Sequence, residues 1–229
     1  QHKIALIFSA MRHFCKELES SGFNVHYFEY SRDGPKTLLD AVKLTLAVTP
    51  VDELRYCQPG EYRLQEEMQA WQLPVPLRMY PDDRFLCSTD DFQAWADGRK
   101  QLRMEYFYRL MRRKYNILLE DDDKPAGGKW NFDSQNRKGW RDQEPVPERP
   151  TPEPDAITTE VIELVRREFP DHPGDLDRFY LATTSREARS HFDWFLQNCL
   201  GRFGTYQDAL AEESPWLFHS LISMYLNIG

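Results

Sequence analysis

The sequence predicts an α/β fold in which helices cover a parallel sheet, followed by a purely helical segment. Helical and strand-like stretches alternate through the first half in units of about thirty residues, a pattern typical of parallel sheets. Beyond residue 155 the apolar patterns all have the helical period. Between the two parts, residues 139–155 contain five prolines and are expected to be extended.

Each element of the first half has a local signal. An apolar stripe at helical spacing covers residues 4–18 and ends at Gly22. Strands are expected at residues 24–30 and 54–57, with a short extended segment at 75–80. The intervening helices are expected at about residues 37–48, 62–71 and 90–96, the last capped by Ser88 and Thr89.

The second half is expected to hold three helices. The first begins at residues 158–160 and reaches Phe169. The second begins at the capping-box pattern of residues 184–187 and stops at Gly201. The third follows Ser214 and Pro215 and continues toward Asn227. The expected division is therefore an α/β domain at residues 1–120, a linker at 121–155 and a helical domain at 156–229.

Composition limits the class of protein. A chain of 229 residues with 41% hydrophobic residues can bury a core. No apolar run approaches the ~20 residues of a membrane span, and residues 1–3 do not begin a signal peptide, so a soluble cytoplasmic protein is expected. The cysteines are far apart and form no Cys-x-x-Cys pair, so no metal ligand is assigned. The four are Cys15, Cys57, Cys87 and Cys199.

Charge is distributed unevenly along the chain. The net charge of −8 argues against tight nucleic-acid binding by this chain alone. Residues 99–114 nevertheless carry seven basic residues against the single acid Glu105, on a helical pattern that also has an aromatic side. This helix could lie against phosphates, or it could be a solvated face over a packed aromatic stripe. Residues 125–133 combine turn formers with Trp130 and Phe132, which indicates an ordered loop.

Several long motifs occur together in this sequence. MEYFY at residues 104–108 is paired with GGKWNFD at 127–133 and with Asn136 and Arg137. SAMRHF stands at residues 9–14, and HSLIS at 219–223. In this combination and order the chain resembles the bacterial photolyase and cryptochrome family that carries an iron–sulfur cluster, also called deoxyribodipyrimidine photolyase-related proteins. The resemblance covers nearly all 229 residues.

The resemblance implies a Rossmann-like antenna domain, a linker and the first helices of an all-α FAD-binding domain. The family's opening strand would precede Gln1. Its sheet crevice holds an antenna chromophore, 6,7-dimethyl-8-ribityllumazine, which Ile7, Met11 and Phe8 would contact. These three residues could equally be core residues that face the sheet.

The C-terminal motif carries the expected flavin contact. Hydroxyls and free N–H groups near a helix start can bind phosphate oxygens, although a Ser-x-x-Ser pair within a helix is usually structural. By resemblance, a Ser-x-Leu-Ser stretch cradles the diphosphate of FAD, and Tyr206 stands one residue from the position of a tyrosine that touches the same phosphates. The expected cofactor-binding residues are Ser220, Leu221, Ile222, Ser223 and Tyr206, with isoleucine at 222 in place of the usual leucine.

The function that the resemblance implies is light-dependent repair of ultraviolet pyrimidine photoproducts in DNA, of the (6-4) type, by electron transfer from reduced FAD. Damaged DNA and an absent C-terminal catalytic region are the expected partners. The flavin ring pocket, the ligands of the 4Fe-4S cluster and the catalytic histidines are expected in that absent region. No catalytic residue is therefore assigned, and this part alone is expected to be inactive.

Two alternatives remain at this point. One is a blue-light photoreceptor of the cryptochrome type, which has the same fold but does not repair DNA. The other sets the resemblance aside and is a flavodoxin-like interaction domain with a helical appendage. Nothing within the residues separates the first alternative from a photolyase.

Overall fold

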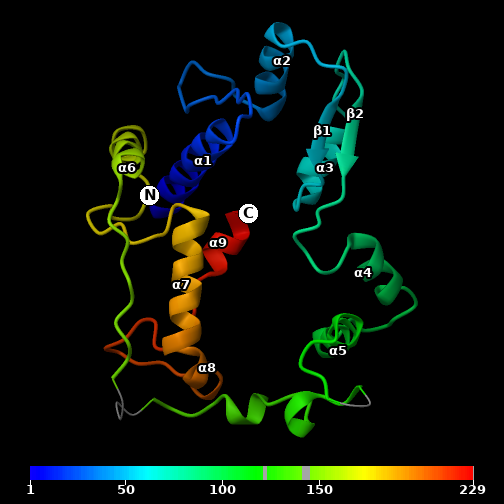
Figure 1. Cartoon of the computed structure of the whole chain (residues 1–229), viewed down its shortest axis with the longest axis vertical. Coiled ribbons are helices and arrows are strands. Elements are labelled where there is room, and N and C mark those ends of the chain that lie inside the picture. Colours follow the sequence, from blue (N-terminus) through cyan, green and yellow to red (C-terminus); the bar gives the residue numbers. More distant parts are fainter. Residues whose placement is uncertain (121–122, 141–144, 229) are drawn as a thin grey trace. The chain divides into compact units, whose positions relative to one another are not determined.

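A computed structural model describes residues 1–120, 123–140 and 145–228 (Figure 1). The chain forms two compact units, which are treated separately. The first, the helical unit, combines Gln1–Val25 with Asn131–Gly229, and the second, the sheet unit, is His26–Trp130. The expected linker at 121–155 lies partly outside the described residues, so the domain division at residues 120 and 155 stays a prediction for the longer protein.

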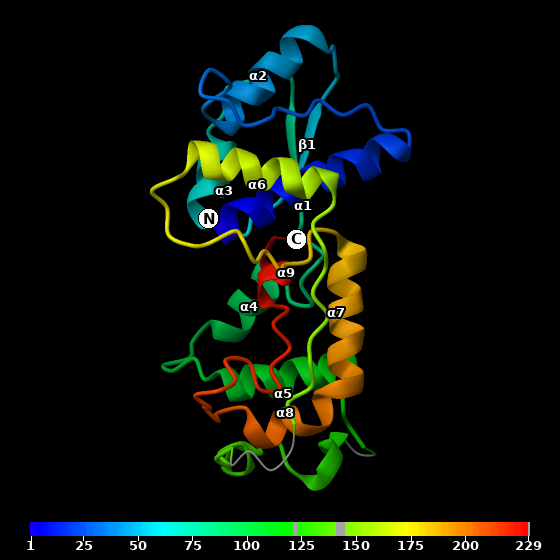
Figure 2. The same cartoon turned by 90° about the vertical axis from the view of Figure 1, so that its left-hand side faces the viewer.

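The helical unit is built on the packing of α1 (His2–Ser20) against α6 (Ala156–Glu168), which lie along each other in Figure 2. Ala5 on α1 and Val161 and Val165 on α6 have no exposed surface. These positions repeat at four-residue intervals, so each helix presents one apolar side to the other. The core is completed by Leu6, Ile162, Leu176, Phe179 and Leu181.

The remaining helices of this unit are α7 (Ser185–Asn198), α8 (Leu200–Tyr206) and α9 (Ser223–Ile228), with the 3₁₀ turn η3 (Asp133–Gln135) before them. The expected capping box is confirmed, because Thr184 accepts from the Glu187 N–H and the Glu187 carboxylate accepts from the Thr184 N–H. The side chain of Asp155 caps α6 by accepting from the Thr158 N–H at 2.9 Å. Both helices therefore begin close to the positions that the sequence predicts.

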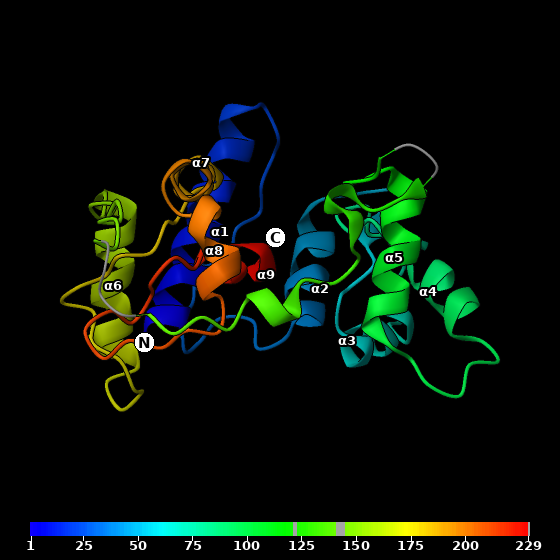
Figure 3. The ribbon, with the colours of Figure 1, turned by 90° about the horizontal axis from the view of Figure 1, so that it is seen from below.

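The sheet unit contains a two-stranded parallel sheet, β1 (Leu54–Cys57) and β2 (Leu77–Tyr80), in which Leu54 pairs with Leu77 (Figure 1). The helices are α2 (Leu38–Val48), α3 (Tyr62–Gln69), α4 (Thr89–Ala96) and α5 (Met104–Tyr115), with the 3₁₀ turn η2 (Ala126–Gly128). Figure 3 shows α4 beside α5, where Phe92 and Trp95 lie 5.2 and 5.0 Å from the Phe107 ring centre. The mixed helical and parallel-strand architecture is compatible with the expected α/β class.

Three expected elements were wrong. Residues 24–30 form no assigned strand, because a strand needs a partner and the described residues contain only the pair β1 and β2. The helix expected to stop at Gly201 breaks earlier, at Cys199, and resumes as α8. The basic helix begins at Met104 and not at residue 99, because residues 99–103, which follow Gly98 with its positive φ of +70°, form no helix.

The fourth correction concerns the C-terminal helix. Residues 215–218 are bends and turns, residues 219–222 have no regular structure, and α9 begins only at Ser223. Leu217 and Leu221 have φ angles of +42° and +56°, in the left-handed region, which a continuous right-handed helix excludes. Leu217 and Phe218 are instead buried against Phe195 and Cys199. Burial of these side chains therefore outweighs the helical tendency of the segment.

Two apolar residues of α1 differ in burial, which predicts different effects on stability when each is replaced by Ala. Leu6 is 3% exposed, whereas Met11 is 53% exposed. Replacing Leu6 by Ala should lower the free energy of unfolding by about 3 kcal/mol, because a cavity is left beside α6. The matched change Met11→Ala should lower it by less than about 1 kcal/mol. Urea denaturation followed by circular dichroism measures both, and equal losses would contradict the described packing.

Candidate functional site

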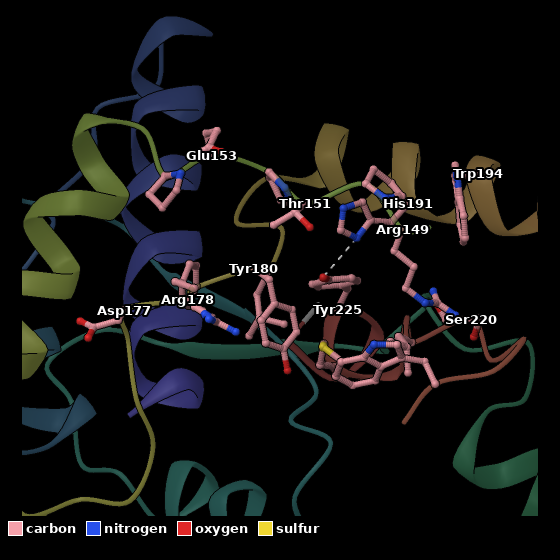
Figure 4. Close-up of a pocket in the computed structure, with 18 residues that line it drawn as sticks. Arg149, Thr151, Glu153, Asp177, Arg178, Tyr180, His191, Trp194, Ser220 and Tyr225 are labelled. Carbon is pink, nitrogen blue, oxygen red and sulfur yellow. Dashed lines mark hydrogen bonds between the residues drawn. The ribbon is translucent and has the colours of Figure 1, made fainter. Parts of the chain in front are cut away.

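A cavity of about 510 Å³ lies within the helical unit (Figure 4). It is lined by residues 149–154, residues 177–181, helix α7 and the turn before α9. Pro150, Pro152 and Pro154 hold the first of these segments extended, as expected for the described part of the proline-rich stretch. All six residues of this segment, the three prolines included, line the cavity, so the segment forms one of its walls.

Arg149 is the principal polar contact in the cavity. Its guanidinium donates to the carbonyl oxygen of His219 and, at 3.5 Å, to that of Ser220. It also lies over the indole of Trp194 on α7, 5.3 Å from the ring centre. Burial lowers the pKa of Arg149 from its ordinary value, yet arginine keeps its charge in proteins. One cation therefore joins the proline-rich segment, α7 and the turn before α9.

His191 and Tyr225 form a second polar contact, drawn as a dashed line in Figure 4. The Tyr225 hydroxyl oxygen accepts from the Ala182 N–H at 3.1 Å and lies 3.4 Å from His191 Nδ1. Because the amide proton points at this oxygen, the hydroxyl proton is available for Nδ1, which then acts as the acceptor. Burial lowers the pKa of His191, and the charge of Arg149 lowers it further against an opposing effect of Glu187. Both effects favour the neutral form of the imidazole.

Of the predicted phosphate-binding residues 220–223, two line the cavity and two do not. Ser220 and Leu221 line it, whereas Ile222 and Ser223 do not. Leu221 adopts a left-handed conformation that is uncommon for a residue other than glycine. Such a conformation persists only where the surroundings fix it, and here Arg149 holds the carbonyls just before it.

The other predicted site residues do not join this cavity. Tyr206 packs in the second core cluster, where its ring centre lies 5.3 Å from Trp140 and 5.6 Å from Phe218. Ile7 is half-buried on α1, and Met11 on the same helix is largely exposed. Cofactor binding by these three residues stays a prediction, as does binding by Ile222 and Ser223.

Comparison with known proteins decides the family. Residues 1–181 match the family model of deoxyribodipyrimidine photo-lyase-related proteins. The chain belongs to this family. It is 42% identical over 232 residues to a (6-4) photolyase of Agrobacterium fabrum, an alignment that covers 99% of this chain and 45% of that protein. The chain thus spans less than half the length of that relative.

The chain is also similar, at lower identity, to uncharacterized protein R852 of Acanthamoeba polyphaga mimivirus. It is 22% identical over 142 residues, which cover 59% of this chain and 70% of that protein. The resemblance to the photolyase-related family that the motifs indicated is confirmed by the family model and by the Agrobacterium protein.

Sequence reasoning missed most of the cavity of this photolyase-related chain. Arg149, His191 and Tyr225 were not predicted as site residues, nor were the aromatic walls Trp194 and Trp216. The available signal was Arg149 itself, a single cation among prolines, since such a segment must satisfy its polar groups elsewhere.

The described residues contain no group of three or more His, Cys, Asp or Glu side chains that could hold a metal ion. No described helix is long and apolar enough to cross a membrane.

Arg149 and Arg178 provide a matched pair for testing the cavity. Both line it, but among the described residues Arg178 has no hydrogen-bond or ion-pair partner. Arg149→Met leaves two carbonyls unpaired and should lower the free energy of unfolding by about 2 kcal/mol. Arg178→Met should change it by less than about 0.5 kcal/mol. Urea denaturation distinguishes them, and a similar loss in both variants would show that the Arg149 contacts do not stabilise the turn.

The lowered pKa of His191 predicts a pH dependence of stability. Its ordinary value is 6.5, and the folded-state value lies below it. Between the two values the unfolded chain binds more protons, so the free energy of unfolding falls as the pH falls below about 6.5. His191→Gln should flatten this dependence, whereas His172→Gln, at an exposed residue, should not. Urea denaturation at pH 5 and pH 7.5 measures both, and equal slopes in all three proteins would exclude this role.

Proposed function

We propose that this chain is the N-terminal portion of a light-dependent, flavin-containing DNA photolyase that repairs ultraviolet pyrimidine photoproducts of the (6-4) class. The observation that carries the proposal is 42% identity to a (6-4) photolyase across 99% of the chain. The same identity, together with the family match over residues 1–181, weighs against a flavodoxin-like interaction domain. Ultraviolet-damaged DNA and the remaining length of the protein are the proposed partners.

The cavity supports the flavin part of the proposal. Its volume of about 510 Å³ is in the range of small-molecule sites. The cations Arg149 and Arg178 and the hydroxyl of Ser220 suit phosphate oxygens. Ser220 to Ser223 would hold the diphosphate of FAD. When bound, reduced FAD supplies the light-driven electron for repair, and the protein orients it.

The contribution of this chain is to position and shield the diphosphate. Arg149 fixes the carbonyls of His219 and Ser220, so the Ser220 side chain is presented at a fixed angle. The contact between His191 and Tyr225 adds no negative charge to the cavity, whose carboxylates are those of Glu153 and Asp177. Preorganised groups of this kind lower the cost of ordering a site when the ligand binds.

The finer parts of the proposal concern the antenna, the cluster and the compartment. We place 6,7-dimethyl-8-ribityllumazine near Ile7 and Met11 and the ligands of a 4Fe-4S cluster outside this chain. The four cysteines are free thiols, which agrees with a cytoplasmic protein. Catalytic residues are likewise placed in the remaining length of the protein, so these 229 residues alone would be inactive.

The decisive experiment uses the longest form of the protein. It should purify with a flavin absorption band and restore an oligonucleotide that contains a (6-4) photoproduct under blue light, but not in the dark. A cyclobutane dimer oligonucleotide serves as the lesion control and should be left unrepaired. Repair in the dark would overturn the proposal. A bound flavin without repair would instead identify a photoreceptor of the same fold.

Variants of the serines test the proposed diphosphate contact in the same protein. Ser220→Ala with Ser223→Ala should weaken flavin retention at least about tenfold, because charge-assisted hydrogen bonds are lost. The control is Ser190→Ala, since the Ser190 hydroxyl donates to the Arg186 carbonyl oxygen within α7 and Ser190 does not line the cavity. Flavin released on dialysis is measured by fluorescence. Equal retention in both variants would contradict the assignment of Ser220 and Ser223.

A further inference from the structure

The sheet unit carries a surface that the proposed function does not use. We define the α5 face by Tyr106, Arg109 and Arg113 on α5 and by Lys129 and Trp130 on the loop after it. The three helix positions are three and four residues apart and therefore lie on one side of α5. Guanidinium groups and rings alternate along it: Arg109 lies 5.7 Å from the Tyr106 ring centre and 5.5 Å from that of Trp130, and Arg113 lies 4.7 Å from Trp130.

The α5 face is fixed from beneath by Arg112. This residue is only 7% exposed and donates to the carbonyl oxygens of Ile117, at 3.1 Å, and Leu118. Its guanidinium also lies 5.0 Å from the Trp130 ring centre. The following loop is tied back by the bonds from the Ala126 N–H to the Leu118 oxygen, at 2.8 Å, and from the Gly127 N–H to Glu120, at 3.1 Å. Trp130 is therefore held in place before any partner binds.

Two cations of the α5 face have no carboxylate partner among the residues that the structure describes. Arg109 pairs with Glu105, and the neighbouring Lys114 pairs with Asp91 at 2.9 Å. Arg113 and Lys129 are exposed, and no acidic side chain of the described residues forms an ion pair with either. The local positive charge contrasts with a net charge of −8 for the chain. Such a local excess attracts a polyanion.

The aromatic surface indicates which polyanion fits. On this face Tyr106 is 49% exposed and Trp130 is half-buried. Nucleic acids offer both phosphates for the cations and flat bases and sugars for the rings, whereas an acidic peptide would use the cations alone. We propose that the α5 face is a second contact for DNA, in which Arg113 and Lys129 bind phosphates of the strand outside the lesion. The choice of DNA as the partner rests on the proposed function.

The test is the salt dependence of DNA binding by the longest form of the protein. Arg113→Gln with Lys129→Gln removes the two unpaired cations. Each lost phosphate contact should reduce the slope of log affinity against log salt by about 0.9, so the double variant should lose about 2. Binding to a short undamaged duplex at low salt should weaken roughly tenfold per contact. Fluorescence anisotropy in the dark, across a series of NaCl concentrations, measures both quantities.

The matched control removes two exposed cations elsewhere in the sheet unit. Lys43 lies on α2, and Arg63 on α3 has a side chain that is 89% exposed. Lys43→Gln with Arg63→Gln changes the net charge equally and should leave the slope unaltered. The single variant Lys129→Gln, in a loop, should still reduce the slope by about 1 if the double variant does not fold. An unchanged slope in both test variants would overturn the proposal.

Two further measurements separate this surface from the proposed function and from another partner. Repair under blue light at saturating DNA tests the photolyase function itself; a reduced salt slope in a protein that repairs nothing would leave the DNA contact standing. Binding to polyglutamate tests the acidic peptide. If the double variant lost polyglutamate binding and kept its DNA affinity and slope, the α5 face would be a protein contact and the proposal would be wrong.

Discussion

The geometry of the cavity depends on one half-buried cation. Arg149 donates to two successive carbonyls of the turn before α9 and stacks on Trp194 of α7, so it links three segments that share little regular structure. Prolines deprive residues 149–154 of N–H donors, and the left-handed Leu221 breaks the chain direction before α9. The polar groups of such a backbone cannot all be paired by the hydrogen bonds of a helix or a β-sheet. A guanidinium, with five donors and a flat apolar face, meets both needs at once.

The sheet unit uses the same arrangement independently. Arg112 donates to the successive carbonyls of Ile117 and Leu118 and stacks on Trp130, and Leu118, like Leu221, has a positive φ. In each case the left-handed leucine interrupts regular backbone hydrogen bonding, and an arginine side chain donates to the carbonyl oxygens at or just before it. The indole lowers the cost of burying the charge through a cation–π contact. The turn at Ile117 and Leu118 and the turn in the HSLIS motif at 219–223 are therefore each ordered by an arginine outside the turn itself.

The sequence predicted features that depend on neighbouring residues and missed features that depend on distant ones. The Thr184 cap, the strand at residues 54–57 and the extended chain at residues 145–155 follow from short-range rules and agree with the structure. The helix expected from residue 214 failed because Leu217 and Phe218 are buried against Phe195, more than twenty positions earlier in the chain. Arg149 was missed for the same reason, since its partners at 219 and 220 lie about seventy residues away. A resemblance can locate the serines of the turn, but it cannot show what holds them.

The two arginine arrangements differ in what they leave exposed, and this difference separates their roles. Around Arg149 the charge is half-buried, and the surrounding rings face a cavity of limited volume, which suits a small ligand. Around Arg112 the charge is almost fully buried, while Arg113 and Lys129 are exposed on the α5 face together with Tyr106, which suits an extended polyanion. Arg112 makes the hydrogen bonds that order the backbone here, so the neighbouring cations Arg113 and Lys129 are not needed for that role. Residues 99–114 therefore combine the two interpretations of the basic helix: Arg112 belongs to a packed aromatic stripe, and Arg113 remains available to phosphates.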